Sequence, residues 1–175
     1  MPQSTLLTIL HHESDGEFRF RVVRADGVPT NPVELPSPYD YSVDGAPNAV
    51  LMDELQWYLE EFLNYPYYPD TLRAERVQKA MRAWGERVFT ALFNGPARDL
   101  YTKAVASGHQ HLTLKFVSND PRVLSWPWEL LADPNTVPLG HASKIVRRLH
   151  DVAAPRPISP DLPANRVNIL LVIAR

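Results

Sequence analysis

Few side chains in this sequence can do chemistry, and they do not form a complete catalytic set. The 175 residues include no cysteine, so the chain offers neither a thiolate nucleophile nor a zinc-thiolate site. The histidine pairs are His11-His12 and His109-Gln-His111. Residues 109 and 111 would share one face of a strand, but two ligands without a third do not make a metal site. With no glycine-rich phosphate loop either, we predict no metal, no cofactor and no catalytic residue.

The densest group of distinctive residues lies between Leu124 and Pro134, where two tryptophans flank a proline. Aromatic rings bury large areas and proline fixes φ at the start of a short helix, so a structural role is predicted. Alternatively, Glu129 is an acid or base with a raised pKa in an apolar pocket. In the structural interpretation, Glu129 binds backbone N–H groups or pairs with Arg147 or Arg148. The residues of this motif are Trp126, Pro127, Trp128, Glu129, Leu130, Leu131, Arg147 and Arg148.

Charge is divided unevenly along the chain, although the net charge is only −2. Residues 1–70 carry twelve acids and three bases, and the remainder carries eight acids and fifteen bases. We interpret this division as two faces of one domain that attract each other, with an acidic docking element and a basic partner surface as the alternative. The absence of a global basic field argues against nucleic acid as a partner.

The longest apolar run is too short to span a bilayer, and the N-terminus lacks the features of a signal peptide. We therefore expect no membrane association and a cytoplasmic location.

The elements expected to position these residues begin with strands. Residues 5–11 and 17–24 have strand-like patterns and are separated by an Asp-Gly turn signal, which predicts a β-hairpin. A third short strand is expected at Tyr39–Val43. Together these segments predict an antiparallel sheet with one face in water.

Helical periodicity dominates the middle of the chain. Apolar residues recur at helical spacing over residues 49–63 and 70–93, and a shorter helix is expected over 97–106. Asp70 or Thr71 is the expected cap of the second helix. A basic stripe along that helix is expected to dock against the acidic first helix; its residues are Arg73, Arg76, Lys79, Arg82 and Arg87.

Strand patterns return in the last third of the chain, at residues 111–117 and 141–149. After a proline-rich linker at 155–164 comes an almost wholly apolar run, Asn168–Ala174, which is typical of a central parallel strand. The expected fold class is α+β: an N-terminal antiparallel hairpin or small sheet, two to three helices, then strands that lead into an incomplete α/β sheet. The expected divisions are residues 1–48, 49–154, 155–164 and 165–175.

Three segments resemble the upstream half of bacterial CHAT-domain proteins, the caspase-like cysteine peptidases related to separase. They are the helix Trp57–Pro66, the tryptophan motif followed by Ile145–Arg148, and the segment Asn165–Arg175. The last is similar to the first strand of the caspase-type sheet, so the resemblance implies an incomplete caspase-like sheet. The catalytic histidine and cysteine of that family lie downstream of this strand, so no catalytic position is carried over to this chain.

The resemblance implies a non-catalytic accessory or regulatory portion of a caspase-like peptidase in prokaryotic defence or signalling. Its expected partners are a downstream peptidase domain or another protein chain, including a sensor or a protein substrate. The alternative is a stand-alone adaptor that binds other proteins and has no peptidase attached.

Overall fold

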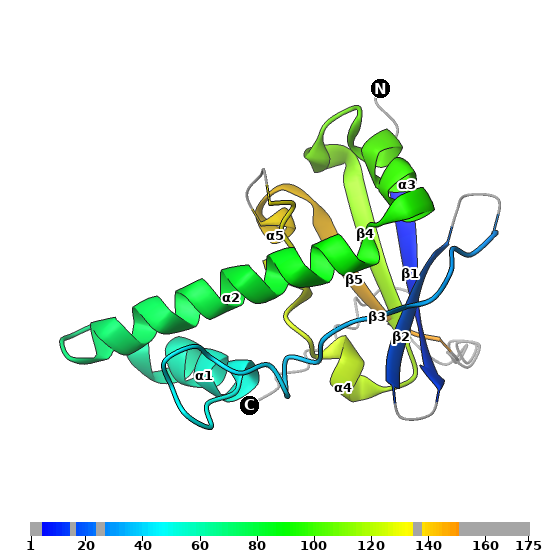
Figure 1. Ribbon diagram of the computed structural model, residues 1–175. Helices are drawn as coiled ribbons and strands as arrows, with labels where there is room; N and C mark the ends of the chain where they lie inside the picture. The colour runs from blue at the N-terminus through cyan, green and yellow to red at the C-terminus, as the bar shows by residue number, and fades with distance from the viewer. Residues whose placement is uncertain (1–4, 15–16, 24–26, 135–137, 151–175) are drawn as a thin grey trace, which may run out of the picture.

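The computed structural model describes residues 5–14, 17–23, 27–134 and 138–150, which form an α+β fold around a five-stranded mixed sheet. The strands lie in the order β3-β2-β1-β4-β5 (Figure 1). Their bounds are β1 (Thr5–Ser14), β2 (Glu17–Val23), β3 (Val33–Glu34), β4 (Leu112–Ser118) and β5 (Lys144–Leu149). The expected α+β class is confirmed.

The predicted hairpin is present, because β1 and β2 pair antiparallel along most of their length. The expected antiparallel N-terminal part is confirmed, since β3 also pairs antiparallel with β2, and it is extended into a mixed sheet by β4, which pairs with β1 in parallel, and by β5, which pairs with β4 in parallel. Parallel strands need a crossover connection, and the helices between β3 and β4 lie within that connection. The N-terminal hairpin and the following region therefore contribute to one sheet.

The third strand is also placed differently from the prediction. Residues 39–40 lie in a turn, in which the Asp40 N–H donates to the Ser37 carbonyl at 3.2 Å and the Ser37 hydroxyl accepts from the Tyr39 N–H at 3.2 Å. Prolines on both sides of Ser37 remove backbone donors that a strand would use. The strand that pairs with β2 is instead Val33–Glu34.

The helices follow the predicted ranges closely. The longer ones are α1 (Leu51–Trp57), which continues as the π-helix η1 (Tyr58–Phe62), then α2 (Asp70–Leu92) and α3 (Gly95–Val105). The shorter ones are η2 (His109–His111), α4 (Pro121–Leu124), η3 (Trp128–Leu130) and α5 (Leu139–Ala142). The expected cap of α2 is wrong, because Pro69 holds the N-cap position and no side chain caps the helix.

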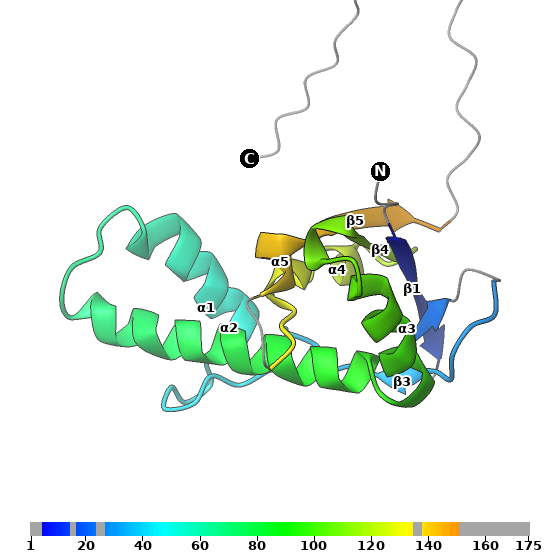
Figure 2. The same cartoon turned by 90° about the horizontal axis from the view of Figure 1, so that it is seen from above.

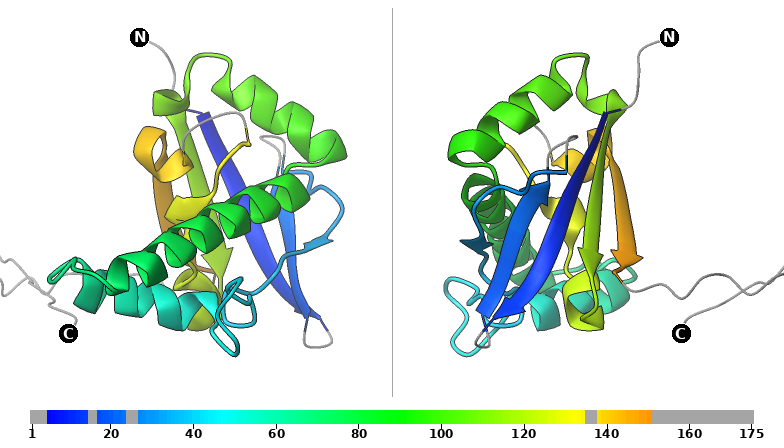
Figure 3. Two further views of the ribbon diagram at one scale, coloured as in Figure 1. Left: turned by 60° about the vertical axis from the view of Figure 1, so that its left-hand side comes forward. Right: turned by 90° about the vertical axis from the view of Figure 1, so that its right-hand side faces the viewer.

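The helices gather on one face of the sheet, as the two views of Figure 3 show. Trp84, Val88 and Phe89 of α2 are fully buried, as are Ile9 of β1 and Leu114 of β4. Alternate residues of β1 point away from this core, and Leu6 is 48% exposed. This alternation agrees with the expected half-wet sheet.

Two expected segments, the proline-rich linker 155–164 and the apolar run Asn168–Ala174, lie outside the described residues. Within the described residues, no helix is both long enough and apolar enough to cross a bilayer.

Candidate interaction site at the tryptophan motif and strand β5

Both tryptophans of the motif are buried, as predicted. Trp126 and Trp128 each have 0% exposed surface, and Pro127 between them is the N-cap residue of η3 with φ −77°. The chain leaves β4, turns through α4 and folds back under α2, so the motif lies between the helix layer and the sheet (Figure 1).

The two indoles are the centre of an aromatic cluster that joins the sheet to α2. Trp128 stacks on Phe116 of β4, with ring centroids 4.0 Å apart and 15° between the planes. Trp126 lies 5.2 Å from Trp128 and 5.4 Å from Phe20 of β2. Trp84 of α2 closes the cluster at 6.3 Å from Trp126. Burial of such rings makes this motif a major part of the hydrophobic core.

The indole N–H groups differ in their partners. Trp128 donates to the Val123 carbonyl at 2.9 Å, and Trp84 donates to the Pro36 carbonyl at 3.0 Å. The buried Trp126 N–H has no acceptor among the described residues. Trp126 therefore contributes through packing, whereas Trp128 contributes packing and a hydrogen bond.

Two glycines allow the backbone after Trp128 to approach its neighbours closely. A Cβ at Gly85 of α2 would lie 1.9 Å from the Leu130 carbonyl oxygen, and a Cβ at Gly140 of α5 would lie 2.7 Å from that of Glu129. Any side chain at either position would displace the motif. A glycine inside a helical pattern was the available sequence signal for Gly85, and sequence reasoning missed it.

Arg147 of β5 fastens the motif to the edge of the sheet. Its guanidinium forms a bidentate ion pair with Glu129, with N–O distances of 2.6 and 2.5 Å. It also donates to the Leu124 carbonyl at 2.8 Å and to the Trp126 carbonyl at 3.2 Å. The adjacent Arg148 is exposed and has no partner among the described residues. The structure thus brings Arg147 to the motif and leaves Arg148 on the surface.

The environment of Glu129 does not match the acid-base alternative, which required a raised pKa in an apolar pocket. The hydrogen bonds from Arg147 lower the pKa of Glu129 and outweigh the opposing effect of burial. Its side chain is 49% exposed, so it does not lie in a closed apolar pocket. A carboxylate held ionised in this way is a structural anchor and a poor proton donor at neutral pH.

Glu129 and Leu130 also line a groove of about 470 Å³ beside α2, together with Met81, Pro138 and His141. The groove is mostly apolar. Its two charged walls are already neutralised, because Glu129 pairs with Arg147 and Arg82 pairs with Glu86 at 2.8 Å.

The histidine pairs do not come together as metal ligands. His109 and His111 lie in the 3-10 helix η2, so they do not share a strand face as expected. His11 instead contacts the Ser118 hydroxyl at 2.8 Å, and His109 contacts the Tyr101 hydroxyl at 3.0 Å. No group of three or more metal-ligating side chains occurs in the part of the chain that the structure describes.

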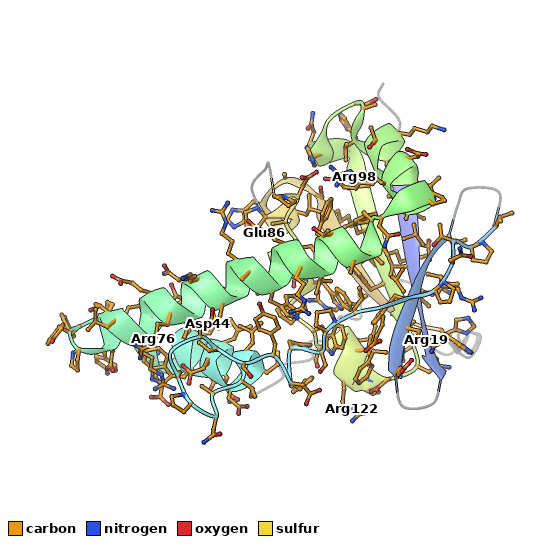
Figure 4. The ribbon with its side chains drawn as sticks, in the orientation of Figure 1. Arg19, Asp44, Arg76, Glu86, Arg98 and Arg122 are labelled. Carbon is orange, nitrogen blue, oxygen red and sulfur yellow. The ribbon has the colours of Figure 1, made fainter. Side chains whose placement is uncertain are left out.

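The basic stripe of α2 is divided among several contacts. Arg73 pairs with Glu54 of α1 at 2.8 Å, as the expected docking of the two helices requires. Arg82 pairs along its own helix with Glu86, and Figure 4 shows Glu86 and Arg76 on different sides of α2. The pair between Arg73 and Glu54 supports the expected docking of the two helices.

Comparisons with protein-family models, with curated proteins and with solved structures find no match to this chain.

Replacing each tryptophan of the motif with phenylalanine separates packing from hydrogen bonding. Trp126→Phe and Trp128→Phe remove the same atoms, but only Trp128→Phe removes the donor to Val123. We expect both variants to be destabilised, and Trp128→Phe by about 1 kcal/mol more. Denaturant titration measures the difference, and an equal or larger loss for Trp126→Phe would contradict this assignment.

Gly85→Ala tests the close approach of α2 to Leu130. Alanine is favoured over glycine in a helix by about 0.5–1 kcal/mol, so the intrinsic effect is stabilising. The clash with the Leu130 carbonyl should reverse the sign and destabilise the protein by about 1–3 kcal/mol. Ala83→Gly, at an exposed position of the same helix, is the control and should show the ordinary helix preference. A Gly85→Ala variant more stable than wild type would refute the packing.

Glu129→Gln keeps the size of the side chain and removes its charge. The folded-state pKa of Glu129 is lowered below the ordinary 4.5, so its stabilisation is present above pH 4.5 and is lost as the pH falls through the folded-state pKa. We expect Glu129→Gln to have a lower free energy of unfolding than wild type at pH 7, and this difference should disappear in acid. In an Arg147→Met background the same substitution should have little effect. A difference in unfolding free energy that does not change with pH, or that persists in the Arg147→Met variant, would contradict the ion pair.

Proposed function

We propose that this chain is the non-catalytic accessory and regulatory portion of a bacterial caspase-like cysteine peptidase of the CHAT family, acting in prokaryotic defence or signalling. In this role it packs against a peptidase core and supplies none of the catalytic residues. The nucleophile and the base are provided by sequence that follows the described region.

The observation that carries the proposal is the contact between the two parts of the second CHAT-like segment, the tryptophan motif and the arginine strand. The tryptophan motif and the Ile145–Arg148 segment meet through the bidentate pair of Glu129 and Arg147. Arg147 also bonds the carbonyls of Leu124 and Trp126. Because Arg147 and the motif are hydrogen-bonded to each other, the tryptophan motif and the arginine strand would be expected to occur together in one family.

The position of β5 adds support. It is the last strand of the described sheet and pairs in parallel with β4. Parallel strands are usually covered by further structure, and an open strand edge readily accepts another strand. Residues 150–167 provide more than the roughly dozen residues that a parallel crossover needs before the apolar run Asn168–Ala174. A peptidase sheet is the addition that the resemblance implies at this edge.

The alternative function is a stand-alone adaptor that binds proteins and has no peptidase attached. The observation that favours it is the group of exposed tyrosines between η1 and α2, since Tyr65, Tyr67 and Tyr68 are each more than 70% exposed. Tyrosine is enriched in protein-protein contacts.

The coding sequence after Arg175 distinguishes the two functions. The accessory role predicts further strands with a His-Gly pair and, later, a cysteine at the end of a strand. The purified chain should cleave no fluorogenic peptide. A stop codon directly after Arg175, or a continuation without both residues, would reject the accessory role in favour of the adaptor.

Amide hydrogen exchange then tests the docking at β5. The chain alone and the longer protein are compared at residues 144–149. We expect the β5 amides that do not bond to β4 to exchange more slowly in the longer protein. The amides of β4, which is paired on both sides, are the internal control. Equal exchange of β5 in both proteins would show that the edge stays open and that the peptidase docks elsewhere or not at all.

A further inference from the structure

Exposed apolar side chains are concentrated at one end of the α1–α2 hairpin. Six of the ten exposed large apolar side chains among the described residues lie within residues 59–72, which we call the aromatic tip. They are Leu59, Leu63, Tyr65, Tyr67, Tyr68 and Leu72, and the tyrosines are 73%, 72% and 78% exposed. Apolar groups gathered in this way on a soluble surface mark a contact site more often than isolated ones do.

The aromatic tip lies far from the core that the rest of the chain builds. Figures 1 and 2 show α1 and the first half of α2 extending sideways from the sheet, with the tip at their outer end. Its side chains therefore do not cover the sheet or the tryptophan motif. A partner can reach them without any rearrangement of the fold.

A π-helix lies where the apolar stripe of the first helix stops being buried. The sequence pattern places Leu59 on the apolar stripe of the first helix together with Leu51 and Leu55. Leu51 and Leu55 are buried, but Leu59 is 54% exposed. The Leu63 N–H bonds the Tyr58 carbonyl five residues back at 3.1 Å, so η1 has a wider turn that rotates the following residues around the axis. Such insertions into α-helices occur frequently at functional sites.

The tip is held on a rigid support. Arg73 of α2 forms a bidentate ion pair with Glu54 of α1 at 2.8 Å for both contacts, and its guanidinium lies 3.8 Å from the centre of the Trp57 ring. Gln78 donates to the Tyr58 hydroxyl at 2.7 Å. These contacts bind the two arms of the hairpin to each other. A pre-organised contact surface loses less conformational entropy on binding than a flexible one.

The charge of the tip defines the partner. Residues 59–72 include Glu60, Glu61 and Asp70, all exposed, and contain no lysine, arginine or histidine. We propose that the aromatic tip is a docking surface for a partner protein whose apolar pocket is rimmed by lysine or arginine. The tyrosines and leucines enter the pocket, and the carboxylates pair with the rim.

Two other occupants fit the observations less well. A second copy of the chain would offer the groove beside Leu130, but the charges of that groove are neutralised by Arg147–Glu129 and Arg82–Glu86. An anionic membrane surface would repel the three carboxylates. The inference uses the same exposed tyrosines that favour the adaptor function, but it does not require that function, because an accessory portion can also carry such a surface.

The experiment places the photo-crosslinker p-benzoylphenylalanine at position 67 of the full chain in its own host cells. Cross-linked protein is identified by mass spectrometry, purified and titrated against the chain. We expect Tyr67→Ser with Tyr68→Ser to weaken binding at least about tenfold. Glu60→Lys with Glu61→Lys should weaken it strongly while leaving the apolar side chains in place. Leu6→Ser, at an exposed apolar residue outside the tip, is the matched control and should bind as wild type does.

The inference is supported if the cross-linked partner has an apolar contact region with a cationic rim. Both tip variants must also bind this partner more weakly than the wild-type chain does. Each variant should unfold at the same temperature as the wild-type protein, which shows that its loss of affinity does not come from a loss of folding. Cross-links only to another copy of the chain, binding to phosphatidylcholine vesicles in place of a protein, unchanged affinity of the variants, or no cross-link at position 67 would each overturn the inference.

Discussion

The burial of Trp126 and Trp128 between α2 and the sheet is the constraint on which the rest of the structure depends. Their rings reach Phe116 and Phe20 in the sheet and Trp84 in the helix, so the two layers share one aromatic cluster. The backbone that follows them fits only because Gly85 lacks a side chain. Strand β5 pairs with β4 at the sheet edge, and the side chain of Arg147 adds hydrogen bonds to this motif. Helix, sheet and edge strand are therefore positioned together by one short segment.

Because the tryptophan motif is buried inside the fold, it offers little surface to a partner protein. The motif has most of its apolar area in the core, and Glu129 is neutralised by Arg147. The two surfaces proposed for partners are the outer edge of β5, which can accept another strand, and the aromatic tip, which can enter a pocket. The first uses backbone hydrogen bonds and the second uses side chains and charge. A chain with both can pack against one protein while it binds another, which is the property that a regulatory portion needs.

Local patterns in the sequence predicted the helices and the hairpin, because each pattern reports which side of one element is apolar. The stripe that includes Val77, Trp84 and Val88 defined α2, and its expected burial is confirmed. The parallel pairing of β1 with β4 was not predictable, since a pattern within one strand does not specify its partner about a hundred residues away. The exposure of Leu59 was missed because helical periodicity shows which side of a helix is apolar and not where along the helix its packing partners end. The ionised state of Glu129 depends on which arginine reaches it, and only the fold decides that.

The central claim, that the tryptophan motif holds the helix layer to the sheet, is tested most directly by following two signals during denaturant unfolding. Near-ultraviolet circular dichroism reports the packing of the tryptophan cluster, and the far-ultraviolet signal reports the helices and strands. If the motif joins the layers, both signals are lost in one coincident transition. Loss of the tryptophan signal at clearly lower denaturant, with helices and strands still in place, would show that the layers hold together without it and would contradict the account.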